Sequence, residues 1–195
     1  MASKTFDEIL AQGVRSGQLP ARTQTSRDWF RNAARTTRVT PEAVVRGERA
    51  KYKNRTTIGK MYLFNYDPKT KDTLPYYDRY PLIFPVERAP GGFYGINMHY
   101  LPLTLRAKLM DKLYELSTDR RYDEKTKLKI GYQILKAASR FAPFKPTFKR
   151  YLSNHVRSRF IEISSSEWDI ALFLPLERFA KASKTKVWAD SRRMI

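Results

Sequence analysis

Short runs of apolar side chains with a period of two lie in the middle of the chain, residues 58–101. In the first run, Met61 and Leu63 would lie on one face of an extended segment, and Tyr62 and Phe64 on the other. A period of two is typical of β-strands, because successive side chains of a strand point to opposite faces. The pattern therefore predicts that this region is built from short strands.

Turn residues divide this region into three strands, with turns at 67–71 and 90–92. These segments are rich in Asp, Pro and Gly, the residue types that tight turns favour. The apolar run between them carries Pro81 and Pro85 at its ends, which predicts a short strand or an edge strand. We expect a short antiparallel β meander, for which a small curled barrel of the SH3 or OB kind is one arrangement.

Beyond residue 101 the apolar positions follow the helical period instead. Leucines recur from Leu103 to Leu116 after Pro102 and predict an amphipathic helix. The elements expected after it are a helix at 122–141, a short helix at 147–155, a strand at 157–163, a strand or a helix at 168–174, and one or two helical turns at 177–182. Strands followed by helices predict an α+β fold.

Residues 1–57 differ from the rest, because they are polar, rich in Arg and poor in large aliphatic side chains. Their apolar content is too small to close a core alone. Short helices are still expected, one of them capped by Thr40, with Pro41 and Glu42 in its first turn. The sequence therefore predicts a largely extended basic arm, 1–57, and a compact α+β body, 58–195, that ends in a basic tail.

Composition changes the picture because the chain carries a large positive excess. It has 38 Lys and Arg against 19 Asp and Glu, a formal charge of +19 and a pI near 10.2. Such an excess usually persists where a polyanion neutralises it, and a merely solubilising surface is the alternative. Arginines in an arm suit phosphate groups or acidic patches on neighbouring subunits equally well. The arm residues assigned to DNA or partner binding are Arg22, Arg27, Arg31, Arg35 and Arg38.

A second basic group, mixed with aromatic residues, falls between positions 144 and 160. If its cations share one face, they form a strip suited to a phosphate backbone. Its aromatic side chains would either stack on unpaired bases or belong to the core. The cations assigned to this site are Lys149, Arg150, Arg157 and Arg159. Because Tyr is enriched at contact surfaces, a proline-bounded tyrosine cluster is assigned to an interface: Tyr76, Tyr77 and Tyr80.

Candidates for catalysis are few. The chain has no Cys and two His, and neither His99 nor His155 stands in a metal-binding spacing. We expect His99 to be packed or hydrogen-bonded rather than to act as a general base. Carboxylates of the β region could hold Mg²⁺ as in a nuclease, but solvated turn positions are expected for Asp67, Asp72, Asp78 and Glu87. We therefore predict a protein that is not an enzyme, with no metal, no cofactor and no membrane span.

Several runs of the sequence resemble small basic virion proteins of T4-like contractile-tailed phages. They are GKMYLFNYD at 59–67, LPYYD at 74–78, PLIFP at 81–85, GINMHYLP at 95–102, NHVRSRF at 154–160 and KVWADSR at 186–192. The resemblance extends from about residue 58 to the C-terminus. It implies a phage particle, with no catalytic residue to carry over. A DNA end protector and a neck or baseplate component are both open.

These observations together favour a non-catalytic structural component of a tailed phage particle, in the tail, baseplate or neck. It would be made in the host cytoplasm and reside in the virion. Its basic extensions would bind other phage structural proteins, or packaged DNA without sequence preference. The alternative is a DNA-binding protein that caps or protects DNA ends, whose affinity would fall steeply as salt rises.

Overall fold

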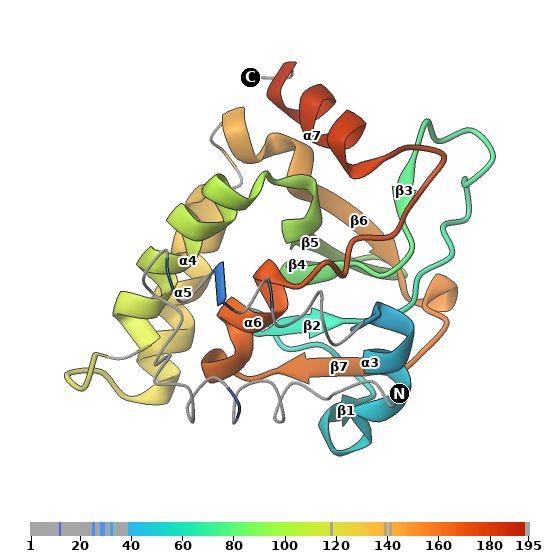
Figure 1. The fold of residues 1–195 in the computed structure, drawn as a ribbon. Coiled ribbons are helices and arrows are strands. Elements are labelled where there is room, and N and C mark those ends of the chain that lie inside the picture. The colour runs from blue at the N-terminus through green and yellow to red at the C-terminus, as the bar shows by residue number, and fades with distance from the viewer. Residues whose placement is uncertain are drawn as a thin grey trace.

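The computed structural model describes residues 12, 25, 28, 29, 32, 39–117, 119–138, 140 and 142–193. These residues combine helices with an antiparallel sheet, which confirms the predicted α+β class (Figure 1). Among them, no helix is both long and apolar enough to cross a membrane.

Six strands form the main sheet in the spatial order β1-β7-β2-β4-β5-β6, and all neighbours are antiparallel. The strands are β1 (Tyr52–Lys53), β2 (Met61–Leu63), β4 (Leu82–Ala89), β5 (Gly92–Asn97), β6 (Phe148–Leu152) and β7 (Phe160–Ile163). A separate small sheet pairs β3 (Tyr77–Asp78) with β8 (Phe179–Ala180). The main sheet therefore joins strands from both halves of the chain.

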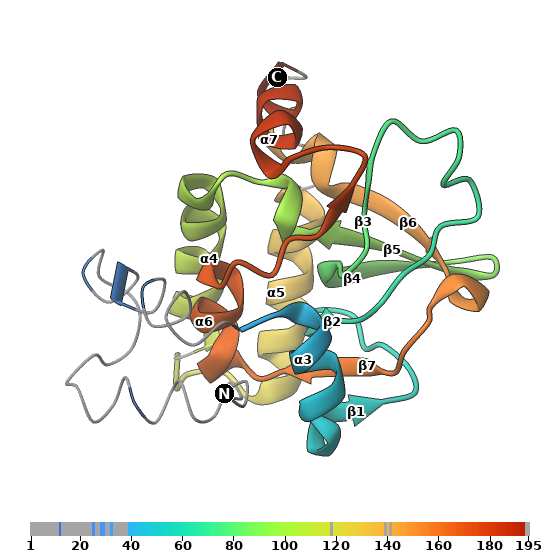
Figure 2. The same cartoon turned by 45° about the vertical axis from the view of Figure 1, so that its right-hand side comes forward.

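Helices cover one face of this sheet. The helices of the described residues are α3 (Pro41–Gly47), α4 (Leu103–Ser117), α5 (Glu124–Ala138), α6 (Trp168–Phe173) and α7 (Lys184–Arg193), and the 3-10 turns are η1 (Arg49–Lys51), η2 (Met98–Tyr100), η3 (Ala142–Thr147), η4 (Ser153–His155) and η5 (Ser165–Glu167). Helices α4 and α5 confirm the two long helices predicted from the apolar period. In both views α4, α5 and α6 lie to the left, and the β4–β5 hairpin extends to the right (Figures 1 and 2).

The two faces of the main sheet bury two different clusters. Met61 and Leu63 belong to the main core under the helices, whereas Tyr62 and Phe64 belong to a cluster on the other face. All four side chains are fully buried, so the predicted alternation of this segment is confirmed. We call the second group the aromatic cluster; its members are Tyr62, Phe64, Tyr66, Ile83, Phe93, Tyr151 and Phe160.

Strand β4 is an interior strand of eight residues, so the prediction of a short or edge strand was wrong. Pro85 has no N–H to donate, which normally excludes proline from an interior strand. The pairing with β5 shifts register between Pro85 and Glu87. This β-bulge accommodates the proline and allows the strand to continue on both sides of it.

Two glycines permit the close approach of β4, β5 and β6. Gly91, in the hairpin turn, has a φ of +70°, a left-handed conformation that glycine adopts without a steric penalty. Gly92 lies against β6, where a Cβ atom would stand 1.9 Å from the carbonyl oxygen of Tyr151. Any larger residue at position 92 would push the edge strand away.

The predicted small barrel is not present, because the described strands form an open sheet with β1 and β6 at its two ends. The meander prediction holds for β2, β4 and β5, which are consecutive neighbours in the sheet. Strand β3 leaves that order and pairs with β8 instead. The long segment between β2 and β3 therefore lies outside the main sheet, where it forms one wall of the site described below.

The short helix predicted at 147–155 is wrong, since this segment forms strand β6 followed by turn η4. Phe148, Tyr151 and Leu152 have the i, i+3, i+4 spacing of a helix. In the structure, however, Phe148 packs against the main core and Tyr151 joins the aromatic cluster. Pairing with β5 over five residues decides the outcome, because it sends the two rings to opposite faces of the sheet.

The helical turns predicted at 177–182 are also wrong, since Phe179 and Ala180 pair with β3. Lys181 has a φ of +66°, which a right-handed helix does not allow. By contrast, the ambiguous segment 168–174 contains helix α6. The basic tail contains helix α7, which no feature of the sequence had indicated.

The described part of the predicted arm packs on the body. Thr40 caps α3, and its Oγ1 accepts a hydrogen bond from the Ala43 amide at 3.2 Å, as its sequence predicted. Val39 and Val44 belong to the main core, and β1 pairs with β7. The division at residue 57 stays a prediction, as does the extended character of the arm.

Candidate nucleic-acid interface

Three adjoining cavities run along the face of the sheet that carries the aromatic cluster. The first, of about 730 Å³, and the second, of about 670 Å³, share Gly92 and Ser153. The second and the third, of about 320 Å³, share Lys69 and Leu152. Because shared residues join each cavity to the next, we treat them as one surface and call it the basic groove.

Side chains of the aromatic cluster form the floor of the basic groove. Phe93 and Phe160 line the first cavity, and Tyr66 and Tyr151 line the third. Phe93 and Tyr151 occupy paired positions of β5 and β6 and stack with ring centroids 5.5 Å apart. The floor is therefore a packed aromatic layer, whose ring contacts add to the stability from burial.

The first cavity is strongly positive. Glu87 is the one carboxylate among the residues known to line it. Arg159 also lies over the ring of Tyr52, 6.0 Å from its centroid. The cations that line this cavity are Lys53, Arg55, Arg88 and Arg159. Four cations against one carboxylate create a positive potential that attracts anions.

The second cavity links the two ends of the groove through Lys69 and His155. The Nδ1 atom of His155 lies 2.9 Å from the backbone oxygen of Asp67. The carboxylate of Asp67 accepts hydrogen bonds from Lys71 and lies 3.6 Å from an Arg157 nitrogen. The hydrogen bond from Lys71 and the neighbouring positive charges lower the pKa of Asp67. Asp67 therefore holds the cations of this segment in place as an anion.

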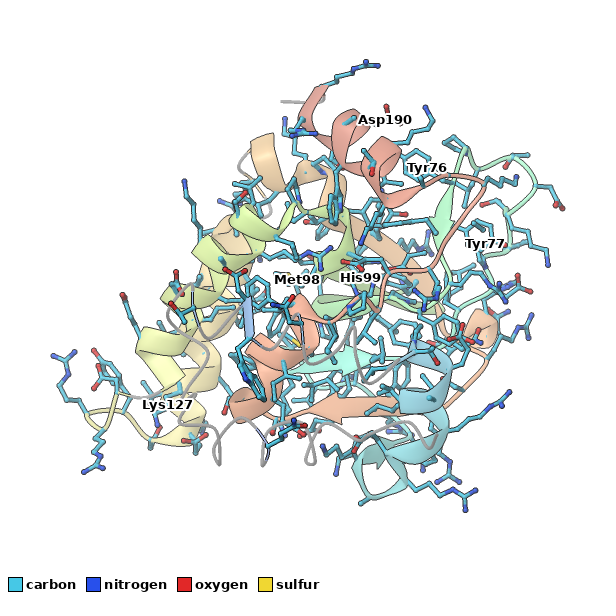
Figure 3. All side chains as sticks on the ribbon, viewed as in Figure 1. Tyr76, Tyr77, Met98, His99, Lys127 and Asp190 are labelled. Atoms are coloured by element: carbon cyan, nitrogen blue, oxygen red, sulfur yellow. The ribbon has the colours of Figure 1, made fainter. Side chains whose placement is uncertain are left out.

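The third cavity combines aromatic walls with three cations, one of which is the Lys69 that it shares with the second cavity. Tyr76, Tyr77 and Tyr100 line it together with Lys149 and Arg150. The ammonium of Lys149 lies 4.3 Å from the ring centroid of Tyr100, within the range of a cation–π contact. Burial lowers the pKa of Lys149. Figure 3 shows Tyr76 and Tyr77 on the same side of the molecule, with Asp190 of α7 near Tyr76.

A buried polar network ties β3 to the main sheet beneath this cavity. One carboxylate oxygen of Asp78 accepts a hydrogen bond from Asn97 at 3.0 Å and lies 2.7 Å from Nδ1 of His99. The other accepts from the Tyr80 amide. Asn97 also donates to the Tyr151 hydroxyl. Asp78 is 4% exposed, so its expected solvation was wrong, whereas the packed, hydrogen-bonded state predicted for His99 is confirmed.

A second buried group joins α4 to the segment that follows α6. The guanidinium of Arg106 lies 2.6 Å from Glu177, and both side chains are nearly inaccessible. Arg106 also donates to the backbone oxygens of Leu101, Leu172 and His99. Burial alone would raise the pKa of Glu177, but the charges of Arg106 and His99 lower it overall. The pair is therefore held in its charged form.

The structure brings some of the predicted site residues together. Lys149 and Arg150 meet Tyr76 and Tyr77 in the third cavity, although the two pairs are about 70 positions apart in the sequence. Arg159 lines the first cavity, at the other end of the groove. The remaining residues lie elsewhere: Arg157 beside Asp67, Tyr80 in the main core, and Arg22, Arg27, Arg31, Arg35 and Arg38 outside the described residues.

Four groove cations had not been selected from the sequence: Lys53, Arg55, Lys69 and Arg88. They come from β1 and the segment after it, from the loop after β2 and from the β4–β5 hairpin. Lys53 and Arg55 belong to a charged run at 46–55, and Lys69 and Arg88 stand near turns, so no local pattern assigns these four cations to one groove. The assembly of β1 and β4 into one sheet places Lys53, Arg55 and Arg88 around the first cavity, and Lys69 lines the second and the third.

The four carboxylates considered for a metal do not gather at one place. Asp67 is engaged by Lys71 and Arg157, Asp78 is buried beside His99, and Glu87 lines the first cavity. Within the described part of the chain, no group of three or more His, Asp or Glu side chains could hold a metal ion. The described carboxylates therefore assemble no metal centre for nuclease chemistry.

Comparison with known proteins agrees with the character of this groove. The model of a protein family described as the phage T4 terminal DNA protecting protein matches residues 4–192. No curated protein and no solved structure matched the chain. The family match covers nearly the whole sequence and confirms the resemblance to T4-like phages, in the form of a DNA end protector. The chain therefore belongs to the phage T4 terminal DNA protecting protein family.

Proposed function

We propose that this protein binds the ends of linear duplex DNA through the basic groove and shields them from exonucleases, without catalysis of its own. The observation that carries the proposal is the continuity of the groove. Its three cavities place Arg88 and Arg159 at one end and Lys149 and Arg150 at the other, with Lys69 between them. A row of cations over an aromatic floor is suited to a phosphate backbone.

The electrostatics of the groove support binding that is independent of sequence. Lys and Arg neutralise phosphates and release counterions, whatever the bases are. The family description concerns terminal DNA, so it favours the DNA-capping alternative over a tail, baseplate or neck component. We extend the proposal to the packaged genome of a virion, where neighbouring phage structural proteins would meet the same positive surface.

The proposal is tested with the full-length protein and an end-labelled linear duplex. The duplex is exposed to a double-strand exonuclease at about 100 mM salt, with and without the protein, and the intact label is followed over time. We expect the protein to delay degradation from both ends. Binding measured by fluorescence anisotropy is expected to weaken steeply between about 50 and 200 mM salt, as counterion release requires.

A variant with Arg88→Gln and Arg159→Gln separates the groove from the total charge. The control variant carries Arg120→Gln and Lys129→Gln. Both residues are exposed cations; Arg120 lies between α4 and α5, and Lys129 lies on α5. We expect protection to be lost in the first variant and kept in the second. Equal protection by both variants would assign DNA binding to another surface, and no protection by the unaltered protein would refute end protection itself.

A further inference from the structure

Phosphate contacts alone do not distinguish a DNA end from the middle of a duplex. The backbone has the same charge and spacing along its whole length. A protein that acts on termini therefore needs a feature that responds to something present only there. A terminal base is unusual because it has a stacked neighbour on one side only, so it leaves the stack at a lower cost than an internal base.

The third cavity of the basic groove differs from the other two in a way that fits a base. Its volume of about 320 Å³ lies at the lower end of the range for small-molecule sites. Tyr76 and Tyr77 are half-buried, so part of each side chain stays open to a ligand. Tyr76 also packs near Tyr100, with ring centroids 6.2 Å apart. The cavity is thus lined by two half-buried aromatic rings, Tyr76 and Tyr77, together with buried tyrosines such as Tyr100.

Two cations stand where the backbone of such a nucleotide would pass. Lys149 extends over the ring of Tyr100 inside the cavity. Arg150 is exposed and donates a hydrogen bond to the backbone oxygen of Pro90, beside the second cavity. Lys69 lines both cavities, so the track of positive charge leads directly into the aromatic one. The acid that also lines this cavity, Asp78, is already engaged by Asn97 and His99.

We propose that the third cavity receives an unpaired terminal nucleotide of the DNA, with its base against Tyr76 and Tyr77 and its phosphate held by Lys149 and Arg150. The proposal rests on the function proposed above and adds the means by which an end is recognised. Aromatic side chains bind bases of any sequence, because every base has a π-face. The cavity would therefore select ends without selecting a sequence.

The test compares ligands that differ in a single base. One duplex is fully paired, a second lacks the base of the last nucleotide at the 5′ end, and a third lacks it at the 3′ end. All other ends are closed by hairpin loops. We expect the unaltered protein to bind one abasic duplex about tenfold more weakly than the paired one, which corresponds to the loss of one stacked base. The abasic duplex that binds more weakly shows whether the 5′ or the 3′ terminal nucleotide enters the cavity.

The same titrations are repeated with Tyr76→Leu, which keeps apolar volume for packing, and with Tyr76→Phe, which keeps the ring. We expect Tyr76→Leu to bind the paired duplex about tenfold more weakly and to show no further loss with the abasic ligand, because both changes remove the same contact. Tyr76→Phe should behave as the unaltered protein does. Tyr122→Leu, at an exposed tyrosine outside the groove, is the matched control.

The outcomes separate the two proposals. Equal affinity of the unaltered protein for paired and abasic ends would overturn the nucleotide pocket while leaving end protection intact. Independent, additive losses from the variant and the abasic ligand would also overturn it. Thermal unfolding of each variant identifies a loss of affinity that comes from misfolding, and the comparison of paired and abasic ends with the unaltered protein then decides the proposal. If the unaltered protein neither binds nor protects DNA ends, both proposals fall together.

Discussion

At the scale of single residues, the buried ion pair of Arg106 and Glu177 has the largest consequence. Arg106 is fully inaccessible, and its guanidinium serves one carboxylate and three backbone oxygens. A buried charge is tolerated only when its hydrogen-bonding groups are satisfied. This one residue therefore connects α4, the turn η2 and the end of α6 in the interior of the protein.

Replacing Arg106 by Met is expected to destabilise the protein strongly. The change leaves Glu177 buried without its partner and removes a donor from the carbonyl groups of Leu101 and Leu172, whereas the His99 carbonyl still accepts from Trp188. Breaking one side of a buried pair typically costs about 3–5 kcal/mol. Urea unfolding followed by tryptophan fluorescence measures the loss. Arg120→Met, at an exposed position, removes the same charge and should leave the midpoint nearly unchanged; a similar loss in both variants would contradict this account.

We expect protonation of Glu177 to account for part of the loss of stability at acid pH. Its pKa in the folded protein lies below the ordinary value of 4.5, because the charges of Arg106 and His99 outweigh burial. A carboxyl group with a lowered pKa contributes stability above its unfolded pKa and loses it as pH falls through the folded one. We therefore expect the unfolding free energy to fall below about pH 4.5, and to fall less steeply in Glu177→Gln.

Unfolding midpoints measured in urea from pH 7 to pH 3 check this dependence. Glu124→Gln is the matched control, since the Glu124 side chain is 87% exposed. It should follow the unaltered protein across the range. If the urea midpoint of Glu177→Gln falls with pH as steeply as that of the unaltered protein, other carboxylates cause the dependence.

At the scale of elements, the edge strand β6 carries much of the candidate site. It holds Lys149 and Arg150, it supplies Tyr151 to the groove floor, and it pairs with β5 along its whole length. Nothing pairs with its other side among the described strands. Its position therefore depends on how closely it can approach β5, and that approach is set at Gly92.

Gly92→Ala is expected to loosen β6 and weaken DNA binding together. The new Cβ atom would lie 1.9 Å from the Tyr151 carbonyl oxygen, so the backbone must shift. Overpacking of this kind costs about 1–3 kcal/mol. Amide hydrogen exchange should show faster exchange along β5 and β6. A Cβ atom at Gly47 meets nothing within 4 Å, so Gly47→Ala should change neither amide exchange nor DNA binding. Unchanged amide exchange in Gly92→Ala would show that β6 keeps its position without the close contact with β5 at Gly92.

At the scale of the whole molecule, the formal charge of +19 is larger than the charge of the cations that line the groove. The cations of the three cavities form one connected row, whereas others lie on α5 and its approach. Total charge and local arrangement therefore make different predictions. Total charge affects any polyanion equally, but only cations that contact phosphates change the number of counterions released.

The salt dependence of DNA binding separates these two effects. Log affinity falls as log salt rises, and changing Lys69, Arg88 and Arg159 to Gln should make this slope shallower by about three units. Changing Arg120, Lys125 and Lys129 to Gln removes the same charge from exposed positions away from the groove. That control should leave the slope nearly unchanged. Equal slopes for the two triple variants would mean that the groove does not contact phosphates.

The features that the sequence determined by itself are local ones. The apolar period of α4 and α5, the alternation from Met61 to Phe64 and the cap at Thr40 each depend on residues within one or two turns or one strand. Side chains that close together obey fixed geometric periods, so a pattern is enough to predict them. Composition likewise indicated a polyanion, and the resemblance indicated a T4-like phage protein.

Tertiary structure alone decided which segments meet. The apolar spacing of Phe148–Leu152 suits a helix, yet the segment is a strand because it pairs with β5. The pairing places the rings of Phe148 and Tyr151 on opposite faces of the sheet. The same pairing brings Lys149 to Tyr76 and Tyr77, and the pairing of β1 with β7 brings Lys53 to Arg159. Contacts between distant segments follow from the packing of the whole core, which no short window of sequence contains.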